Sequence, residues 1–474
     1  MNTFSYFKKK GINTVDSTFY NQIDLWESWY RSNVRGFHGY RVYRGAGNYE
    51  RCRRKSLGAA KKMCEDIADM LFNEKVRLTV NDTTTSEYVN KVLNSARFST
   101  RGNEYQERKA ACGTVAYVPY LSNTVLDDEG QVLSADVKIN YVTAKNIFPT
   151  AWENSRITEC IFRFEKVYDG KTYAQFQHHK REQSDDGYVY VIENTVVLCG
   201  SSWRDLTPAE WDRIPPFKGL AARVETTSDE PQFIIDRLNI VNNMSADDSN
   251  PMGISIFANS VDTLAKLDLE YDSYANEFLL GRKRIFVAPE MLATVNGDQV
   301  FDSNDSVFYQ LPEDYFRDTK EAMHEVNMSL RVTEHEQAIN NDLNLLGFKC
   351  GFGSRYYRFE NRQIATATQV ISENSDLFRA IKKHEIILDD VLRDLIRCII
   401  RLGQAANVPG LVLDTEIVID FDDSIIDDKH TERQEDRQDV AMGAMKLSEY
   451  RAKWYGETED VAETKLPEQT GTVM

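Results

Sequence analysis

The sequence lacks the patterns that mark disulfide-rich, zinc-binding and membrane proteins. Its seven cysteines are scattered, odd in number and never in C-x-x-C spacing, which argues against a disulfide framework or a zinc site and predicts reduced thiols. No apolar run approaches the length of a membrane helix, and residues 1–20 contain no apolar segment of the kind found in signal peptides. The sequence therefore predicts a soluble protein of a cytosolic compartment.

Basic residues are in deficit. The 474 residues include 57 Lys and Arg against 74 Asp and Glu, a formal net charge of -17. Because cations that neutralise phosphates drive nucleic-acid binding, this balance argues against a surface that grips DNA tightly, although DNA can still pass close by. A hydrophobic fraction of 42% and an aromatic fraction of 11% are typical of a folded chain, and the length predicts two to four domains or subdomains.

Three glycines, Gly347, Gly351 and Gly353, at first resemble a loop that wraps a phosphate group. A Walker-type loop needs a lysine directly after its last glycine, but Ser354 stands there and Lys349 lies inside the turn. The sequence also has no H-R-D catalytic loop, no H-E-x-x-H zinc motif and no G-x-S-x-G nucleophile motif. The sequence supports neither an enzyme nor a cofactor.

The stretch IDFDDSIIDD at residues 419–428 is the strongest metal candidate, because hard cations prefer carboxylate oxygens. Its ligands would be Asp420, Asp422, Asp423, Asp427 and Asp428. The stretch lacks the glycine and the terminal glutamate of a calcium-binding loop, so a solvated acidic strand end is favoured and no metal is predicted. His178 and His179 are interpreted as an exposed pair on a strand.

Hydrophobic periodicity predicts an α+β fold. Residues 57–76 place Met63, Ile67, Met70 and Leu71 on one stripe at helical spacing. From 113 to 225 the pattern changes to segments of alternating apolar and polar residues, bounded by turn sequences such as DDEG and DDG. This region is therefore predicted to be β-rich and mostly antiparallel.

After residue 250 the pattern predicts helices separated by a small insertion. Residues 255–281 carry apolar side chains in alternating steps of three and four, a seam that requires a neighbouring helix. Residues 326–332 are predicted as a strand. Thr333 and Glu336 then have the spacing of a capping box, which opens a helix that ends at Gly347.

A long amphipathic helix is predicted from about 366 to 402. Its expected features are a capping box at Thr366, an ion pair between Asp389 and Arg393 one turn apart, and Gly403 as the C-cap. A strand and several short helices are predicted to complete the chain.

This order of elements, together with three stretches, resembles the portal proteins of tailed double-stranded-DNA bacteriophages, especially those of long-tailed phages of Gram-positive hosts. The stretches are NPMGISIFANSVDTLAKLDLEYDSYANEF, EHEQAINNDLNLLGFKCGFGSRYYRF and TATQVISENSDLFRAIKKHE. The resemblance is strongest from about 250 to 402. The run SRYYRF carries more arginine than this place in the family usually has, and residues 113–225 are matched by their order alone.

The resemblance implies a portal fold whose subunits form a ring. It assigns residues 1–250 and 366–429 to a β-rich wing with a long helix and strand, 251–281 and 333–346 to a helical stem, 282–332 to a small α/β clip, 347–365 to a tunnel loop and 430–474 to a helical crown. A seam at 255–281 with no partner in its own chain fits this expectation, because the adjacent subunit would supply the partner.

The implied function is a ring of twelve subunits at one capsid vertex, assembled in the host cytoplasm and retained in the virion. Double-stranded DNA would pass through it non-specifically during packaging and ejection. The implied protein partners are further copies of the chain, the terminase large subunit, later the head–tail connector or adaptor, and the major capsid and scaffolding proteins, with no membrane. Two other classes stay open: a structural head–tail connector protein without the DNA tunnel, and a soluble enzyme with a helical insertion.

The resemblance also implies site residues. In the tunnel loop, transient phosphate contacts are expected from Lys349, Arg355, Arg358 and Arg362, packing against neighbouring subunits from Tyr356 and Tyr357, and hinges at Gly347, Gly351 and Gly353. The competing interpretation is that arginines of this loop pair with acidic residues of the adjacent subunit. Arg282, Lys283 and Arg284 form a second basic cluster at the stem–clip junction, where a solvated collar and a partner contact are equally expected.

Overall fold

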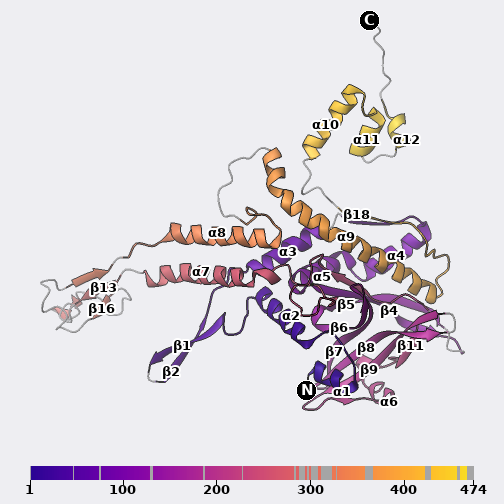
Figure 1. The fold of residues 1–474 in the computed structure, drawn as a ribbon, viewed down its shortest axis with the longest axis horizontal. Coiled ribbons are helices and arrows are strands. Elements are labelled where there is room, and N and C mark those ends of the chain that lie inside the picture. Colours follow the sequence, from indigo (N-terminus) through magenta and orange to yellow (C-terminus); the bar gives the residue numbers. More distant parts are fainter. Residues whose placement is uncertain are drawn as a thin grey trace, which may run out of the picture.

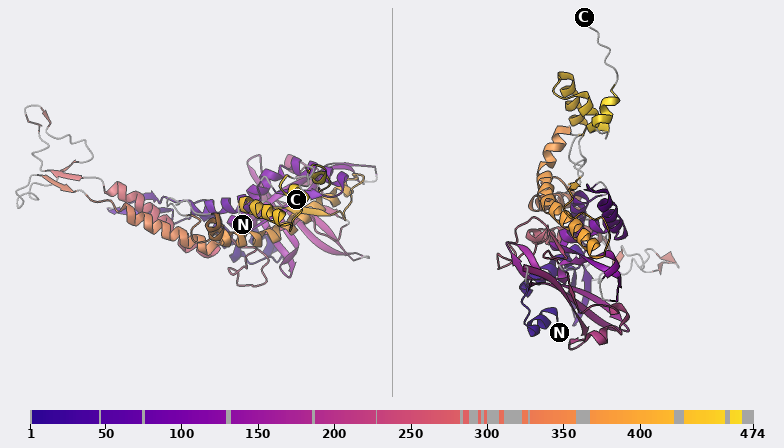
Figure 2. Two further views of the ribbon diagram at one scale, coloured as in Figure 1. Left: turned by 90° about the horizontal axis from the view of Figure 1, so that it is seen from above. Right: turned by 90° about the vertical axis from the view of Figure 1, so that its right-hand side faces the viewer.

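Figure 1 shows an α+β body from which a pair of helices projects, with small strands at the tip of the projection and a separate group of helices near the C-terminus. This computed structural model describes residues 2–45, 47–73, 76–128, 132–184, 187–226, 228–281, 284–287, 294–295, 298–299, 308–310, 323–326, 328–357, 367–421, 429–455 and 459–466. Two further views show that the projecting pair runs side by side along its whole length (Figure 2).

The α-helices of the described residues fall into three groups. The body contains α1 (Thr3–Lys10), α2 (Ser17–Tyr30), α3 (Ala59–Leu71), α4 (Thr83–Ser95), α5 (Phe98–Cys112), the short α6 (Pro208–Trp211) and the long α9 (Ala367–Ala405). The projection consists of α7 (Val261–Leu280) and α8 (Val332–Cys350). The C-terminal group is α10 (Lys429–Met442), α11 (Leu447–Tyr455) and α12 (Glu459–Thr464). Short 3-10 turns lie at Ala144–Asn146, Pro215–Phe217 and Ala258–Ser260.

The strands are predominantly antiparallel. In the body they are β1 (Gly39–Gly45), β2 (Asn48–Arg53), β3 (Arg77–Val80), β4 (Thr114–Leu126), β5 (Val132–Thr143), β6 (Ile147–Glu153), β7 (Arg156–Tyr168), β8 (Lys171–Ser184), β9 (Gly187–Cys199), β10 (Arg204–Asp205), β11 (Arg223–Glu225), β12 (Ile234–Arg237) and β18 (Ile417–Asp420). At the tip of the projection lie β13 (Arg284–Val287), β14 (Thr294–Val295), β15 (Asp298–Gln299), β16 (Phe308–Gln310) and β17 (Met323–Val326).

Two antiparallel sheets form the centre of the body. One has the order β10-β9-β8-β7-β6, with β11 also paired to β9, and the other has the order β12-β4-β5. The pairing confirms the β-rich, antiparallel region predicted for residues 113–225. A single apolar core joins these sheets to the N-terminal helices, to α9 and to the inner ends of α7 and α8.

The long helix α9 packs its predicted stripe into this core. Leu388, Leu392 and Ile399 are buried. The predicted ion pair forms, with the Arg393 guanidinium donating to the Asp389 carboxylate at 2.5 and 3.1 Å. Gly403 is not the C-cap, because the helix continues to Ala405. A Cβ atom at Gly403 would lie 2.5 Å from Leu411 Cδ1 and 2.6 Å from Tyr88 Cε1, so the glycine permits close packing. Thr366, the predicted cap, lies outside the described residues.

The prediction of two exposed histidines is wrong. His178 is half-buried, with Nε2 3.2 Å from Thr150 Oγ1, and His179 is fully buried. The ring of His179 packs between Phe162 and Phe233, each with a centroid separation of 5.4 Å. Burial lowers the pKa of His179 to about 3. At neutral pH its imidazole is therefore uncharged and part of the apolar core.

Candidate functional site

The projecting pair α7 and α8, called the stem hairpin here, packs antiparallel along an apolar seam. Leu264 and Leu267 on α7 are buried, as are Leu343 and Leu346 on α8, and both helices contain apolar residues at the spacing that places one stripe on one face. The expectation that the α7 seam has no partner in its own chain is therefore wrong. The partner is α8, which the sequence separates from α7 by the whole insertion at the tip (Figure 1).

Three ion pairs hold the two helices in register from the tip to the body. Arg331 Nη2 donates to Glu277 Oε2 at 2.8 Å, Lys266 Nζ to Asp342 Oδ1 at 2.8 Å, and Lys349 Nζ to Asp262 Oδ1 at 3.1 Å. The bond from Arg331 lowers the pKa of Glu277 to about 2. Burial and the nearby Asp342 carboxylate raise the pKa of Glu270, although Lys266 opposes the shift.

The start of α8 differs from the predicted capping box at Thr333 and Glu336. The helix begins at Val332, its N-cap is Arg331, and no side chain caps it locally. Instead, the carboxylate of Glu277 on α7 accepts bonds from the backbone and side chain of Arg331. The predicted strand at 326–332 is also wrong, because β17 ends at Val326 and the described residues 328–331 form no strand.

The end of α8 is a Schellman turn and lies beyond the predicted end at Gly347. The backbone N–H of Phe352 donates to Gly347 O at 2.9 Å, and that of Gly351 donates toward Phe348 O at 3.4 Å. Gly351 has φ 84° and Gly353 has φ 83°, left-handed values that favour glycine. The turn therefore terminates a helix, and both glycines have a conformational reason that requires no bound phosphate.

Gly347 lies inside α8, where the missing side chain allows the chain to fold back. A Cβ atom there would be 2.4 Å from Gly353 O, closer than any real side-chain contact. The carbonyl of Gly353 thus sits against the bare backbone of the helix. The region predicted as one loop from 347 begins, in the structure, as a helix end with a turn packed tightly on it.

The aromatic residues after the turn pack on their own chain. Phe352 is buried, and its ring lies 5.3 Å from the rings of Tyr356 and Tyr357. The two tyrosines line a small cavity together with Leu57, Ala59, Lys62 and Met63 near α3 and Leu343 and Leu346 of α8. Burial and the nearby Asp66 carboxylate raise the pKa of Tyr357. The contacts of these aromatic rings that the structure describes lie within the subunit.

The predicted basic residues separate into four groups. Lys349 on α8 is held against α7 by Asp262 and by Thr263 Oγ1, which accepts a hydrogen bond from its Nζ at 2.8 Å. Arg355 is exposed just after the Schellman turn. Arg358, Arg362, Arg282 and Lys283 lie outside the described residues, whereas Arg284 is half-buried on β13 opposite Val326.

Apolar side chains are exposed along the outside of the stem hairpin. Leu345 and Phe348 on α8 are 44% and 71% exposed, and Leu269 on α7 is 47% exposed. Leu345 and Phe348 are three residues apart and share one helix face. Because exposed apolar side chains on a projecting element are typical of a protein interface, these residues make the stem hairpin a candidate binding surface.

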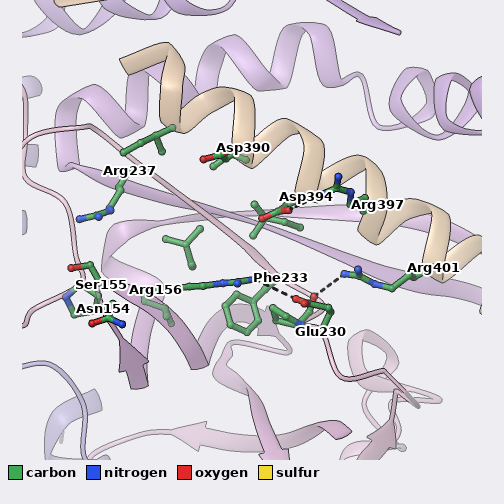
Figure 3. A pocket seen from close by; sticks show the side chains of 17 residues that line it. Asn154, Ser155, Arg156, Glu230, Phe233, Arg237, Asp390, Asp394, Arg397 and Arg401 are labelled. Carbon is green, nitrogen blue, oxygen red and sulfur yellow. Dashed lines mark hydrogen bonds and ion pairs between the residues drawn. The ribbon is translucent and has the colours of Figure 1, made fainter. Parts of the chain in front are cut away.

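A cleft of about 600 Å³ lies between α9, β12 and the turn that joins β6 to β7 (Figure 3). Four arginines line it, Arg156, Arg237, Arg397 and Arg401, together with the acidic residues Glu230, Asp390 and Asp394. The carboxylates nearly balance the guanidinium charges, so the arrangement does not define an anion site. No local sequence pattern indicates the cleft, because its walls come from three distant segments.

No metal site is found in the described ranges, where no group of three or more His, Cys, Asp or Glu side chains could hold an ion. Of the acidic stretch 419–428, only residues 419–421 are described, so the candidate ligands Asp422, Asp423, Asp427 and Asp428 lie outside the described residues. Nor does any described helix combine the length and apolar character needed to cross a membrane.

Comparison with protein families gives a match that spans nearly the whole chain. The family model described as "Phage portal protein, SPP1 Gp6-like" matches residues 10–466. A search of curated proteins finds no match.

Proposed function

Because this chain belongs to the SPP1 Gp6-like family of phage portal proteins, we propose that it forms the dodecameric ring through which DNA enters and leaves the capsid. The family is one of structural capsid components, not of enzymes. The match over residues 10–466 is the observation that carries the proposal. The exposed apolar face of the stem hairpin supports it, because in a closed ring each subunit presents one face to the next.

The arrangement of elements supports distinct roles for the parts of the chain. In the proposed ring, the α+β body is the wing, α7 and α8 are the stem, and helices α10–α12 contribute the crown. The strands at the tip of the stem hairpin (Figure 1) lie far from the body and are proposed as the clip, which binds the terminase first and the head–tail connector later. Weak, non-specific DNA contact suits a conduit, since each firm phosphate contact must break as the duplex moves.

The ring can be tested directly by negative-stain electron microscopy of the purified chain. We expect rings with a central hole. The number of subunits in such recombinant rings is not the criterion. Compact monomers without a hole, at concentrations where the chain is folded, would contradict the proposal and favour one of the other classes of function.

The proposed tunnel loop gives a second test. Replacing Lys349, Arg355, Arg358 and Arg362 with alanine should reduce DNA packaging or genome retention by about tenfold or more, because four transient phosphate contacts are removed at once from each subunit. Ring assembly should be unchanged. Packaging is measured as nuclease-protected DNA per particle.

Lys349 needs its own control, since it also ties α8 to α7 through Asp262. The single variant Lys349→Ala separates loss of this helix contact from loss of DNA contact. Full packaging by the fourfold variant would remove the loop from the mechanism.

A further inference from the structure

A basic β-hairpin projects from the body beside the stem hairpin and has no role in the function proposed so far. Within the described residues, strands β1 and β2 form a two-stranded sheet with no third strand (Figure 1). Residues 39–55 contain six basic side chains and one glutamate, a formal charge of +5 in a chain whose net charge is -17. A two-stranded hairpin is marginally stable by itself, so a charged hairpin of this kind suggests a surface that is completed by binding.

One face of this hairpin is both basic and aromatic. The strand register places Arg41 opposite Arg51 and Tyr43 opposite Tyr49, and Arg53 continues the same face. The two tyrosine rings lie 5.3 Å apart and are 58% and 64% exposed. We call the five residues the Arg-Tyr face.

The arginines of the Arg-Tyr face have no counter-charge in their own subunit. Arg41, Arg51 and Arg53 are exposed, and within the described part of the chain none of them makes a hydrogen bond or an ion pair. Arg41 and Arg51 stand directly across the ladder from each other, an arrangement of like charges that destabilises a strand pair. Elsewhere, exposed arginines such as Arg223 and Arg331 are paired with carboxylates. An acidic surface bound to the Arg-Tyr face would offset this repulsion.

The base of the hairpin is fixed to the stem helix α7 of the same subunit. Asp268 accepts bonds from the backbone N–H of Leu57 at 2.8 Å and from Ser56 Oγ at 3.0 Å, and its other oxygen lies 2.9 Å from His38 Nε2. Asp272 accepts from the backbone N–H of Lys55 at 3.0 Å. These buried bonds set the direction of the hairpin relative to the stem, so in a ring its free end is held at the level of the stems.

The stem helices supply a surface of the opposite charge. Together α7 and α8 contain eight carboxylates and two lysines, a formal charge of -6. Most of the carboxylates are buried or paired within the subunit. Glu334 and Glu336, near the tip of α8, are exposed and have no hydrogen bond or ion pair among the described residues.

We propose that the Arg-Tyr face of one subunit binds the acidic outer end of α8, at Glu334 and Glu336, on the adjacent subunit of the ring. The inference rests on the proposed ring, in which two different patches meet once at every interface. The arginines bind the carboxylates, and the tyrosines cover apolar parts of the neighbouring stem. The hairpin is thus an electrostatic arm that selects the partner and its register.

Charge reversal tests the arm. The variant Arg41→Glu/Arg51→Glu should lower the association constant between subunits by about tenfold or more, because attraction becomes repulsion at each interface. The difference from wild-type rings should be largest at low salt and shrink as NaCl screens both the wild-type attraction and the repulsion in the variant. The readout is the ring fraction in sedimentation velocity over a series of NaCl concentrations, with circular dichroism to verify folding.

Charge reversal on the proposed partner surface gives an independent test. Glu334→Lys/Glu336→Lys alone should weaken rings in the same way, and all four substitutions combined should restore them. The matched control is Arg213→Glu/Lys218→Glu, which changes the net charge equally at exposed positions near α6 and should leave rings intact.

The outcomes separate this inference from the ring itself. If wild-type rings form and the hairpin variant forms them equally well across the salt series, the inference is overturned while the proposed function stands. Loss of rings without recovery in the fourfold variant overturns the assignment of Glu334 and Glu336. Intact rings with reduced retention of DNA in a filter-binding assay would assign the Arg-Tyr face to nucleic acid and likewise overturn the proposal.

Discussion

Replacing Lys109 with methionine is expected to lower the free energy of unfolding by about 3–5 kcal/mol, because it leaves a buried carboxylate without its counter-ion. Lys109 on α5 and Asp236 on β12 are both inaccessible to solvent, and Nζ lies 2.9 Å from Asp236 Oδ1. The second carboxylate oxygen accepts a bond from Gln106 Nε2 at 2.7 Å. Chemical denaturation followed by circular dichroism measures the change.

The expected effect is large because α5 and β12, both in the core, meet α9 at this pair. His384 of α9 is buried beside it and accepts the backbone N–H of Asn239 at 3.2 Å. Burial and the positive charge of Lys109 lower the pKa of His384 to about 3, so the histidine stays neutral and cannot replace the lost cation. Methionine fills much of the lysine volume. The loss in the free energy of unfolding therefore reflects the missing charge and not a cavity.

A lysine in an exposed ion pair serves as the control. Lys10 on α1 pairs with Asp205, and the two side chains are 43% and 37% exposed. Lys10→Met should therefore change stability by less than about 1 kcal/mol. The double variant Lys109→Met/Asp236→Asn should recover part of the loss, since no charge is then buried. Equal effects of Lys109→Met and Lys10→Met would show that the buried pair contributes no more than a surface pair.

The regular elements could be predicted from the sequence where one local pattern is sufficient. Periodicity predicted α3, α7, α9 and the antiparallel strands between residues 113 and 225, because burial on one face leaves a repeat of 3.6 or 2 residues. The resemblance of three stretches to phage portal proteins predicted the family, and the match over residues 10–466 confirms it.

The remaining features depend on contacts between distant residues. Gly347 stands inside a helix because the Gly353 carbonyl approaches it, and Gly403 does so because Tyr88 and Leu411 approach it. Judged from the local sequence alone, a glycine at either position is typical of the C-terminal end of a helix. His179 is buried for a similar reason: its environment comes from Phe162 and Phe233, which no local pattern connects to it.

The basic hairpin was missed as a unit although its signal is present. Two segments with alternating tyrosine and arginine flank the glycine-containing turn GAG, a pattern typical of a β-hairpin. What the sequence cannot provide is the register, which alone brings Arg41 opposite Arg51. Nor can it show that the base of the hairpin is bound to Asp268 on α7, more than two hundred residues away.

Leu345→Asp/Phe348→Asp is expected to abolish rings while the subunit still folds. In the proposed ring these two side chains are buried against the adjacent stem. Burial of each is worth about 1.5–3 kcal/mol, and an unpaired carboxylate in the same place is unfavourable. Together the losses reach about 4 kcal/mol, or nearly a thousandfold in the association constant at each interface. Every interface of a closed ring carries the same loss.

The monomer should tolerate these changes, because Leu345 and Phe348 are exposed on α8 and aspartate costs little more than helix propensity there. The control is Gln337→Asp/Asn341→Asp, which adds the same two negative charges at exposed positions on the same helix face and should leave rings intact. Native mass spectrometry and negative-stain images give the subunit number, and thermal melting verifies the fold. Rings that persist unchanged in the double variant would place the interface elsewhere and leave the exposed phenylalanine unexplained.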